Sequence, residues 1–230
     1  MITRDDVEKE IYKMYKVHPS MKELDYKVRY RAEDLAKNYT QDDVQGMKGA
    51  FLPLDRKLLI AVENHKDLED VRTTIKHELY GHVATYNMTK IQKKDLLNGI
   101  QTLQKDPKVK EYWDIVIKLH PSYTKDMQAE EVFAYISEKS DVGLKIVNDV
   151  NYRVRSYDDI KNVSHHLQND MLTGRATQKI TPERNDLQFR EYTDKEPDMK
   201  KNPLIEKVKS FCKVRDAKQK APEKSLGMER

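Results

Sequence analysis

The sequence predicts an α+β fold that is predominantly helical, with a small β-hairpin packed on one central helix. Apolar residues recur at helical spacing through most of the chain, whereas residues 50–62 carry the one convincing strand pattern. Charged residues make up 36% of the chain and hydrophobic residues 37%, a polar composition that still permits a folded core. A chain of 230 residues is long enough for one large domain with an extended tail.

Residues 5–37 are expected to form two helices. Ser20 and Glu23 have the spacing of a capping box, which marks the start of the second helix. The apolar stripe of that helix would consist of Met21, Leu24, Val28 and Leu35. We therefore assign residues 1–45 to an N-terminal helical segment.

Two short apolar runs predict a β-hairpin. The runs cover residues 50–54 and 57–62, and Asp55 and Arg56 separate them. Proline has no backbone N–H to donate to a neighbouring strand, so Pro53 favours an edge position for the first strand.

A helix that begins at Asn64 or Asp67 is expected next. Its first turn is acidic, which favours the positive end of the helix dipole. Its apolar positions are Leu68, Val71, Ile75, Leu79 and Val83. The segment His77-Glu78-Leu79-Tyr80-Gly81-His82 lies in its C-terminal half, so two imidazoles and one carboxylate share a single helix.

The remaining helices are expected in the second half of the chain, near residues 90–105, 108–119, 128–140, 156–172 and 203–219. Pro121 interrupts the chain after the second of these. We expect residues 46–175 to form the main domain. Residues 176–230 are expected to form a polar, basic C-terminal helix and a flexible tail.

Histidines and carboxylates are the only groups in this chain that can build a catalytic metal site. Cys212 is the single cysteine, which excludes a cysteine cluster and an intramolecular disulfide and fits a reducing, cytoplasmic compartment. A catalytic zinc site needs three protein ligands and an open position for water. His77 and His82 supply two ligands of Zn²⁺ in this interpretation, and Glu78 stands where a general base is required.

The spacing of the two histidines demands a distorted helix. They are five positions apart, one more than in a standard zinc-peptidase helix. In a regular α-helix such residues point roughly 140° apart around the axis, too far to share one ion. A π-bulge closes an i→i+5 turn and removes this divergence, and Gly81 lowers the steric resistance to it. We therefore predict that the helix is widened at Leu79–Gly81.

The third ligand is expected from a downstream helix that carries Glu130 and Glu131. Two adjacent carboxylates allow one to bind the metal while the other orients a ligand histidine. The alternative is that both are ordinary exposed residues near a helix N-terminus. The histidine motif upstream favours a ligand.

The motif from His77 to His82 resembles the His-Glu-x-x-Gly-His signature of dipeptidyl peptidase III, a zinc peptidase with an inserted residue between its histidines. That family has two glutamates downstream, followed by Ala at the third position after the second, as Glu131 and Ala134 are placed here. The chain departs from the family in its shorter length and in Tyr135, which stands where the family places an aspartate.

The resemblance implies a role for each residue of the site. The zinc ligands would be His77, His82 and Glu131, the general base would be Glu78, and Glu130 would lie just outside the ligand shell.

The order of elements over about residues 49–140 is also similar to compact bacterial metallopeptidase domains of the ImmA/IrrE type. Zincin domains of this kind occur in large polyvalent proteins of plasmids, phages and conjugative elements. This second resemblance implies a zincin-like fold for residues 46–175 and a mobile-element setting. It also implies that the strand at 57–62 borders the substrate cleft.

The leading functional prediction is a cytoplasmic zinc peptidase that acts on a peptide or protein substrate. The alternative is a non-catalytic zincin-fold module that binds DNA or a protein partner in conjugation or gene regulation. Residues 195–230 hold 11 Lys or Arg against six Asp or Glu, a surplus that suits weak contact with nucleic acid. A third possibility is a helical protein in which the motif is coincidental. No apolar run approaches the roughly 18 residues of a membrane span.

A peptidase also needs a donor to the oxyanion of its transition state. Nothing in the spacing selects among the candidates, which are Tyr86, His120, Tyr123, His165 and His166.

Overall fold

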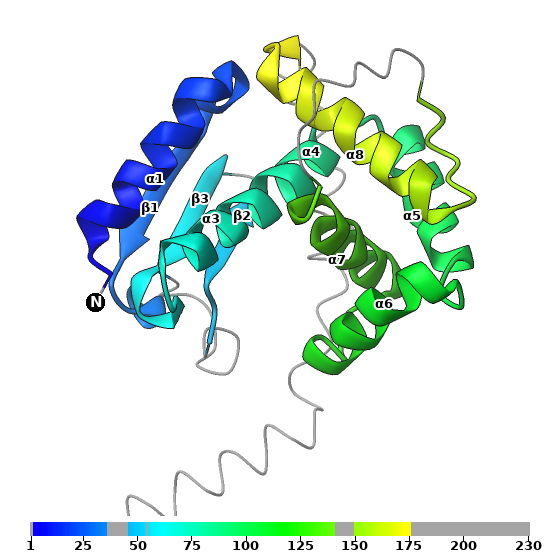
Figure 1. Ribbon diagram of the computed structural model, residues 1–230, viewed down its shortest axis with the longest axis horizontal. Coiled ribbons are helices and arrows are strands. Elements are labelled where there is room, and N and C mark those ends of the chain that lie inside the picture. The colour runs from blue at the N-terminus through cyan, green and yellow to red at the C-terminus, as the bar shows by residue number, and fades with distance from the viewer. Residues whose placement is uncertain (1, 36–45, 54, 141–149, 176–230) are drawn as a thin grey trace, which may run out of the picture. The chain divides into compact units, whose positions relative to one another are not determined.

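The computed structural model describes residues 2–35, 46–53, 55–140 and 150–175. The chain divides into two units, Met1–Thr181 and Pro182–Arg230. The second unit, with the predicted helix at 203–219 and Cys212, lies outside the described residues. Within the first unit, helices predominate and three strands form one small sheet (Figure 1), which confirms the predicted α+β class. No helix among the described residues is both long and apolar enough to cross a bilayer.

Among residues 2–35, the described part of the N-terminal region, there is one long helix. Helix α1 (Arg4–Val17) starts at a capping box formed by Thr3 and Asp6. The predicted second helix is wrong: a short 3₁₀ turn, η1 (Pro19–Glu23), leads into strand β1 (Asp25–Arg29) and a second turn, η2 (Ala32–Asp34). The hydroxyl of Ser20 caps no helix and instead donates a hydrogen bond to the carbonyl of Met171, 2.8 Å away.

The sheet has the strand order β1-β3-β2. Strands β2 (Gly49–Leu52) and β3 (Lys57–Ala61) pair antiparallel, which confirms the hairpin, and β1 pairs with β3 in parallel. Strand β2 is at an edge, as Pro53 predicted. The expectation that residues 57–62 present a free edge to a cleft is wrong, because β3 is the central strand and both of its edges are paired. Strand β2 supplies the edge nearer to the histidine helix.

The histidine helix runs as one rod of three pieces. A short turn, η3 (Val62–Asn64), precedes α3 (Leu68–Lys76), whose first residue follows an N-cap at Asp67 and not at Asn64. The Asp67 carboxylate accepts the Asp70 N–H at 2.8 Å. The rod then widens into a π-helix, η4 (His77–Val83), and ends in α4 (Ala84–Tyr86). The predicted widening is confirmed, and it extends beyond Leu79–Gly81.

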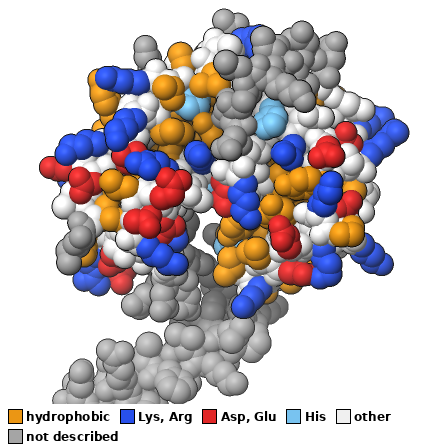
Figure 2. Space-filling view, viewed as in Figure 1, with side chains coloured by type: hydrophobic (Ala, Val, Ile, Leu, Met, Phe, Trp, Pro, Cys, Tyr) orange, Lys and Arg blue, Asp and Glu red, His pale blue; other side chains and the backbone are white. Residues whose placement is uncertain are grey.

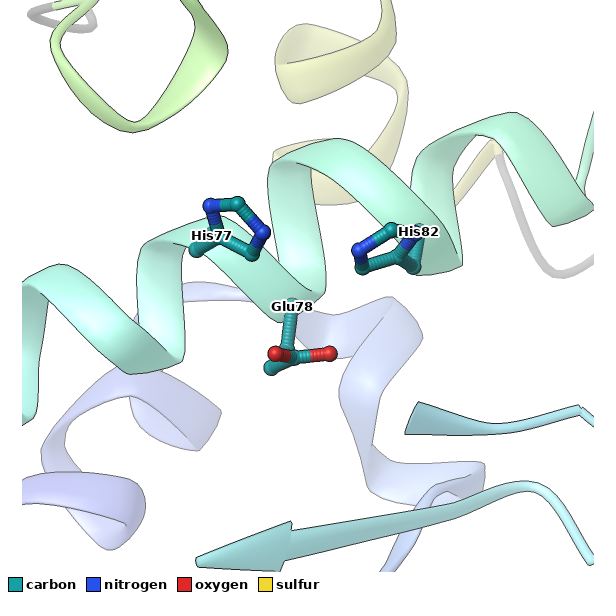
Figure 3. Close-up of side chains that lie close together, drawn as sticks. All are labelled: His77, Glu78 and His82. Atoms are coloured by element: carbon teal, nitrogen blue, oxygen red, sulfur yellow. The ribbon is translucent and has the colours of Figure 1, made fainter. Parts of the chain in front are cut away.

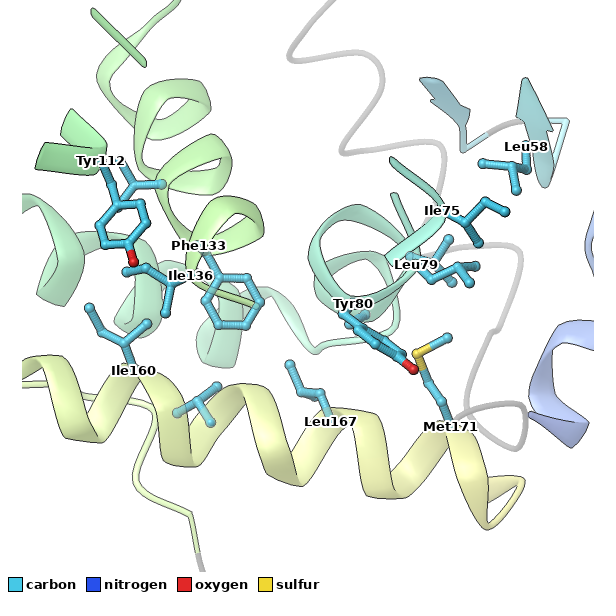
Figure 4. Packing of buried hydrophobic residues seen from close by; sticks show 14 of the residues in the cluster. Leu58, Ile75, Leu79, Tyr80, Tyr112, Phe133, Ile136, Ile160, Leu167 and Met171 are labelled. Carbon is cyan, nitrogen blue, oxygen red and sulfur yellow. The ribbon is translucent and has the colours of Figure 1, made fainter. Parts of the chain in front are cut away.

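Four further helices complete the described unit. They are α5 (Lys90–Thr102), α6 (Pro107–Leu119), α7 (Lys125–Glu138) and α8 (Tyr157–Leu172), close to the predicted ranges. Helix α7 packs against η4, α5, α6 and α8, which makes it the hub of the helical part. In Figure 4, Phe133 and Ile136 of α7 lie over Ile160 and Leu167 of α8, while Leu58 of the sheet faces the histidine rod.

Candidate metal centre

Three chemically competent groups gather on η4. Single ligand atoms of His77, Glu78 and His82 all lie within 4.8 Å of one another. The π-turn produces this arrangement, since it brings the two imidazole centroids to 5.3 Å despite the five-residue spacing. Figure 3 shows both rings along one side of the helix, with the Glu78 carboxylate below and between them.

Glu131 of α7 lies against both imidazoles. Its two carboxylate oxygens lie 3.3 Å from His77 Nε2 and 3.6 Å from His82 Nε2. The first is a long hydrogen bond, and the second is an ion-pair distance beyond hydrogen-bond range. They match the edge of a tetrahedron around zinc, about 3.3 Å for ordinary Zn–N and Zn–O bond lengths. The structure therefore brings together the three ligands that the sequence resemblance implied.

The other nitrogen of each imidazole faces a different carboxylate. His77 Nδ1 lies 2.8 Å from Glu138 Oε2, and His82 Nδ1 lies 3.2 Å from Glu130 Oε1. A carboxylate at Nδ1 fixes the tautomer and orientation of a histidine that binds metal through Nε2. Sequence reasoning anticipated Glu130 and missed Glu138. The available signal for Glu138 was its position two helical turns after Glu131.

Tyr135 occupies the position at which the resemblance led us to expect an aspartate. Its ring packs edge-on against the His77 imidazole, with centroids 4.9 Å apart. The carboxylate for His77 comes instead from Glu138, almost one turn further along α7. With Tyr135 in place of an aspartate, His77 therefore contacts both an aromatic ring and the carboxylate of Glu138.

Glu78 has the environment of a proton acceptor. The residue is 5% exposed, and its Oε2 is buried without a hydrogen-bond partner in the described structure. Burial raises the pKa of its carboxyl group, against the opposing charges of His82 and His77 and a backbone hydrogen bond from Phe51. A buried, unsatisfied carboxylate oxygen beside two imidazoles is costly unless a ligand completes it, so the donor set fits a zinc ion with an adjacent base.

The surrounding carboxylates strongly favour positive charge at this centre. Burial lowers the pKa of His77, but hydrogen bonds to Glu131 and Glu138 outweigh it and raise the pKa to about 10. For His82 the corresponding balance, dominated by Glu131 and Glu130, raises the pKa to about 9. Without metal, both imidazoles are therefore protonated at neutral pH and neutralise the carboxylates. A divalent cation would replace those two protons.

The centre is partly accessible to solvent. The side chains of His77 and His82 are 14% and 19% exposed, enough for a small group to reach them. Figure 2 shows the face of the described unit hollowed between the surface over α3 and the surface over α6 and α7.

Gly81 is required for the approach of α7 to η4. A Cβ at this position would lie 2.3 Å from the Ala134 Cβ and 2.8 Å from its Cα. The sequence predicts that Gly81 eases the distortion of the helix. The structure adds a packing reason, since only a residue without a side chain lets the ligand helices meet so closely. The pair Gly81 and Ala134 thus sets the separation between both histidines and Glu131.

Gly81→Ala is expected to lower the free energy of unfolding by about 3 kcal/mol, because the new methyl group forces η4 and α7 apart. An alanine in an unobstructed helix would instead stabilise by up to about 1 kcal/mol. Chemical denaturation of the metal-free protein measures the change. The double variant G81A/A134G removes the 2.3 Å contact but not the 2.8 Å one, so we expect partial recovery. A G81A variant as stable as the wild type would contradict the packing role.

The candidate oxyanion donors occupy different places. His120 follows α6, stacks on Tyr123 with centroids 4.4 Å apart, and lies near enough to Glu131 that its charge lowers the pKa of that residue. Tyr86 packs against Phe51. His165 and His166 lie on α8, where His166 lines a cavity of about 220 Å³ together with Tyr152 and Asp170. Among these candidates, an electrostatic interaction with Glu131 connects His120 to the centre.

A known protein similar to this chain is DNA primase TraC of Escherichia coli, which is 26% identical over 215 aligned residues. The match covers 83% of this chain, and the chain spans about 15% of the length of that relative. No family model matches the sequence. No solved structure matches it either.

Proposed function

We propose that this chain is a zinc-dependent peptidase that hydrolyses a peptide or protein substrate. The observation that carries the proposal is the convergence of His77, His82 and Glu131 around one position, with the buried and unsatisfied carboxylate of Glu78 beside it. His77 and His82 would hold Zn²⁺ through Nε2, and Glu131 through a carboxylate oxygen. Histidine and carboxylate ligands with one open position are typical of catalytic zinc sites.

The chain's own residues supply the remaining parts of the chemistry. Zinc, when bound, supplies Lewis acidity and a water whose pKa falls to about 7. Glu78 accepts a proton at Oε2 and passes it to the leaving amine, a role that suits a carboxyl group whose pKa burial has raised. Glu138 and Glu130 hold the two imidazoles in the Nδ1–H tautomer. We assign the role of hydrogen-bond donor to the oxyanion to His120, which interacts electrostatically with Glu131.

A second proposal treats the same fold as a binding module. Its specific support is the relative's name, DNA primase, which favours a setting in which nucleic acid is handled. In this version the centre is structural, and the basic surplus of residues 195–230 contacts nucleic acid. A mobile-element setting suits both proposals. So does the cytoplasm, because a chain with a single cysteine requires no oxidising compartment.

Zinc content tests the centre directly. The wild-type protein is expected to bind one zinc ion per chain, and the double variant H77A/H82A none, because two of three ligands are lost. The matched control H165A/H166A removes two histidines from α8 and should retain zinc. Elemental analysis after dialysis measures all three proteins. Equal zinc in wild type and H77A/H82A would end the metal hypothesis.

Nucleic-acid binding tests the second proposal. A mobility shift of single- or double-stranded DNA that weakens steeply with salt, and that disappears when residues 195–230 are deleted, would support it. If the protein bound no DNA at low salt but cleaved a peptide library, the nucleic-acid-binding proposal would be contradicted and the peptidase proposal retained.

A further inference from the structure

Lys93 is unusually buried for a lysine. It lies on α5, and its side chain is 14% exposed, whereas the next residue, Lys94, is exposed. Lysines are rarely buried unless a carboxylate pairs with them. The ammonium of Lys93 meets that condition at Glu130, with Nζ 2.7 Å from Oε2.

The pairing divides the two oxygens of Glu130 between different tasks. Oε2 receives Lys93. Oε1 faces His82 Nδ1 at 3.2 Å and accepts a hydrogen bond from the Thr85 hydroxyl at 2.9 Å. With both oxygens engaged, the carboxylate cannot rotate without breaking one of these contacts. Glu130, which holds the His82 imidazole, is therefore itself held in place by Lys93 and Thr85.

We propose that Lys93 is a positioning residue of the metal centre. From α5 it fixes Glu130, Glu130 fixes the His82 ring, and that ring then directs Nε2 toward Glu131. The inference rests on the proposed zinc site and adds to it a residue from a helix that carries no ligand. A residue three steps from the metal still matters, because mutation of partners outside the ligand shell typically lowers metal affinity about 10- to 100-fold.

The two histidines are consequently supported in different ways. His77 has a close carboxylate partner in Glu138, at 2.8 Å, and the Tyr135 ring beside it. His82 has a more distant carboxylate at 3.2 Å, whose position depends on Lys93 and Thr85. Loss of Lys93 should therefore loosen the His82 side of the centre and leave the His77 side in place.

The first experiment compares zinc affinities. Lys93→Met keeps the length of the side chain and removes the ion pair, and we expect it to weaken zinc binding about 10-fold, the lower end of the range for partners of metal ligands. Lys94→Met deletes an equal charge from the exposed neighbour, so it measures the through-space effect of one lost charge. Lys93→Arg retains an ion pair and should recover most of the affinity. Competition with a chromophoric chelator gives the dissociation constants of the wild type and the three variants.

The second experiment separates positioning from folding. The visible absorption of the Co²⁺-loaded protein reports ligand geometry, and it should shift in K93M but not in K94M. In the E130Q background, K93M should have little further effect on zinc affinity, because Lys93 acts through Glu130.

Three outcomes are distinguishable. A K93M protein with wild-type zinc affinity and an unchanged Co²⁺ spectrum would overturn the role of Lys93 and leave the zinc site standing. Full, additive effects of K93M and E130Q would overturn it as well. If the wild-type protein bound zinc but cleaved no peptide, the peptidase proposal would be wrong. The zinc affinities of K93M and K94M would still test the positioning role of Lys93.

Discussion

Replacing Glu78 with glutamine is expected to lower peptide hydrolysis by about 10²- to 10⁴-fold, the usual contribution of a general base, while zinc remains bound. Glutamine has nearly the same shape as glutamate and cannot accept the proton. The substitution also removes a buried carboxylate whose Oε2 lacks a hydrogen-bond partner in the described structure, so the fold should not be weakened. Mass spectrometry of a digested peptide library measures cleavage, and elemental analysis measures zinc.

Glu69→Gln is a suitable control for Glu78→Gln. Glu69 lies on α3 of the same rod, pairs with Arg72 on the surface, and should be dispensable for cleavage. Equal cleavage by E78Q and the wild type would contradict the role of Glu78 as general base. Loss of zinc from E78Q would make Glu78 a ligand in place of a base, an arrangement that the clustering of its carboxylate with both histidines makes worth testing.

Zinc affinity is expected to rise steeply with pH. In the metal-free protein the pKa values of His77 and His82 are raised to about 10 and about 9, so each ion must displace two protons at neutral pH. Because protons compete with the metal, affinity should increase by up to about 100-fold per pH unit below pH 9, or about 10⁴-fold from pH 6 to pH 8. Chelator competition at several pH values measures the slope.

Calorimetry in buffers with different ionisation enthalpies provides an independent count of the protons released on zinc binding. Removal of Glu138, the closest carboxylate partner of His77, should reduce the pH slope, because the pKa of His77 would fall in E138Q. A zinc affinity that is flat between pH 6 and pH 8 would show that the imidazoles are already neutral and would contradict the electrostatic description of the centre.

Local signals predicted much of the fold and most of the site. The hairpin, the widened helix and the paired glutamates could be found because each depends on residues close together in sequence. Strand β1 was missed for the opposite reason. Tyr26 and Val28 alternate with polar residues, but Val28 alone is buried within the strand, and its partner β3 lies about thirty residues away in parallel. The alternating pattern is therefore too short to outweigh the helical spacing of the apolar residues between Met21 and Leu35.

The missed site residues share a physical cause. Glu138 reaches His77 because α7 packs against η4, and Lys93 reaches Glu130 because α5 packs against α7. No motif spacing encodes either approach. Both residues look like ordinary surface charges in the sequence. Only their burial and partners in the folded chain distinguish them from exposed neighbours such as Lys94.

The additional residue in η4 also determines how the rod faces its surroundings. In a regular α-helix, one inserted residue would rotate everything after it by roughly 100° about the helix axis. Before the widened turn, Ile75 shares a core with Leu58 of the sheet; after it, α4 packs against α8. An uninterrupted α-helix would turn one of these apolar faces away from its partner. The π-turn therefore has two consequences: it brings the two imidazoles together, and it absorbs the rotation that the additional residue would otherwise impose on the apolar positions that follow it.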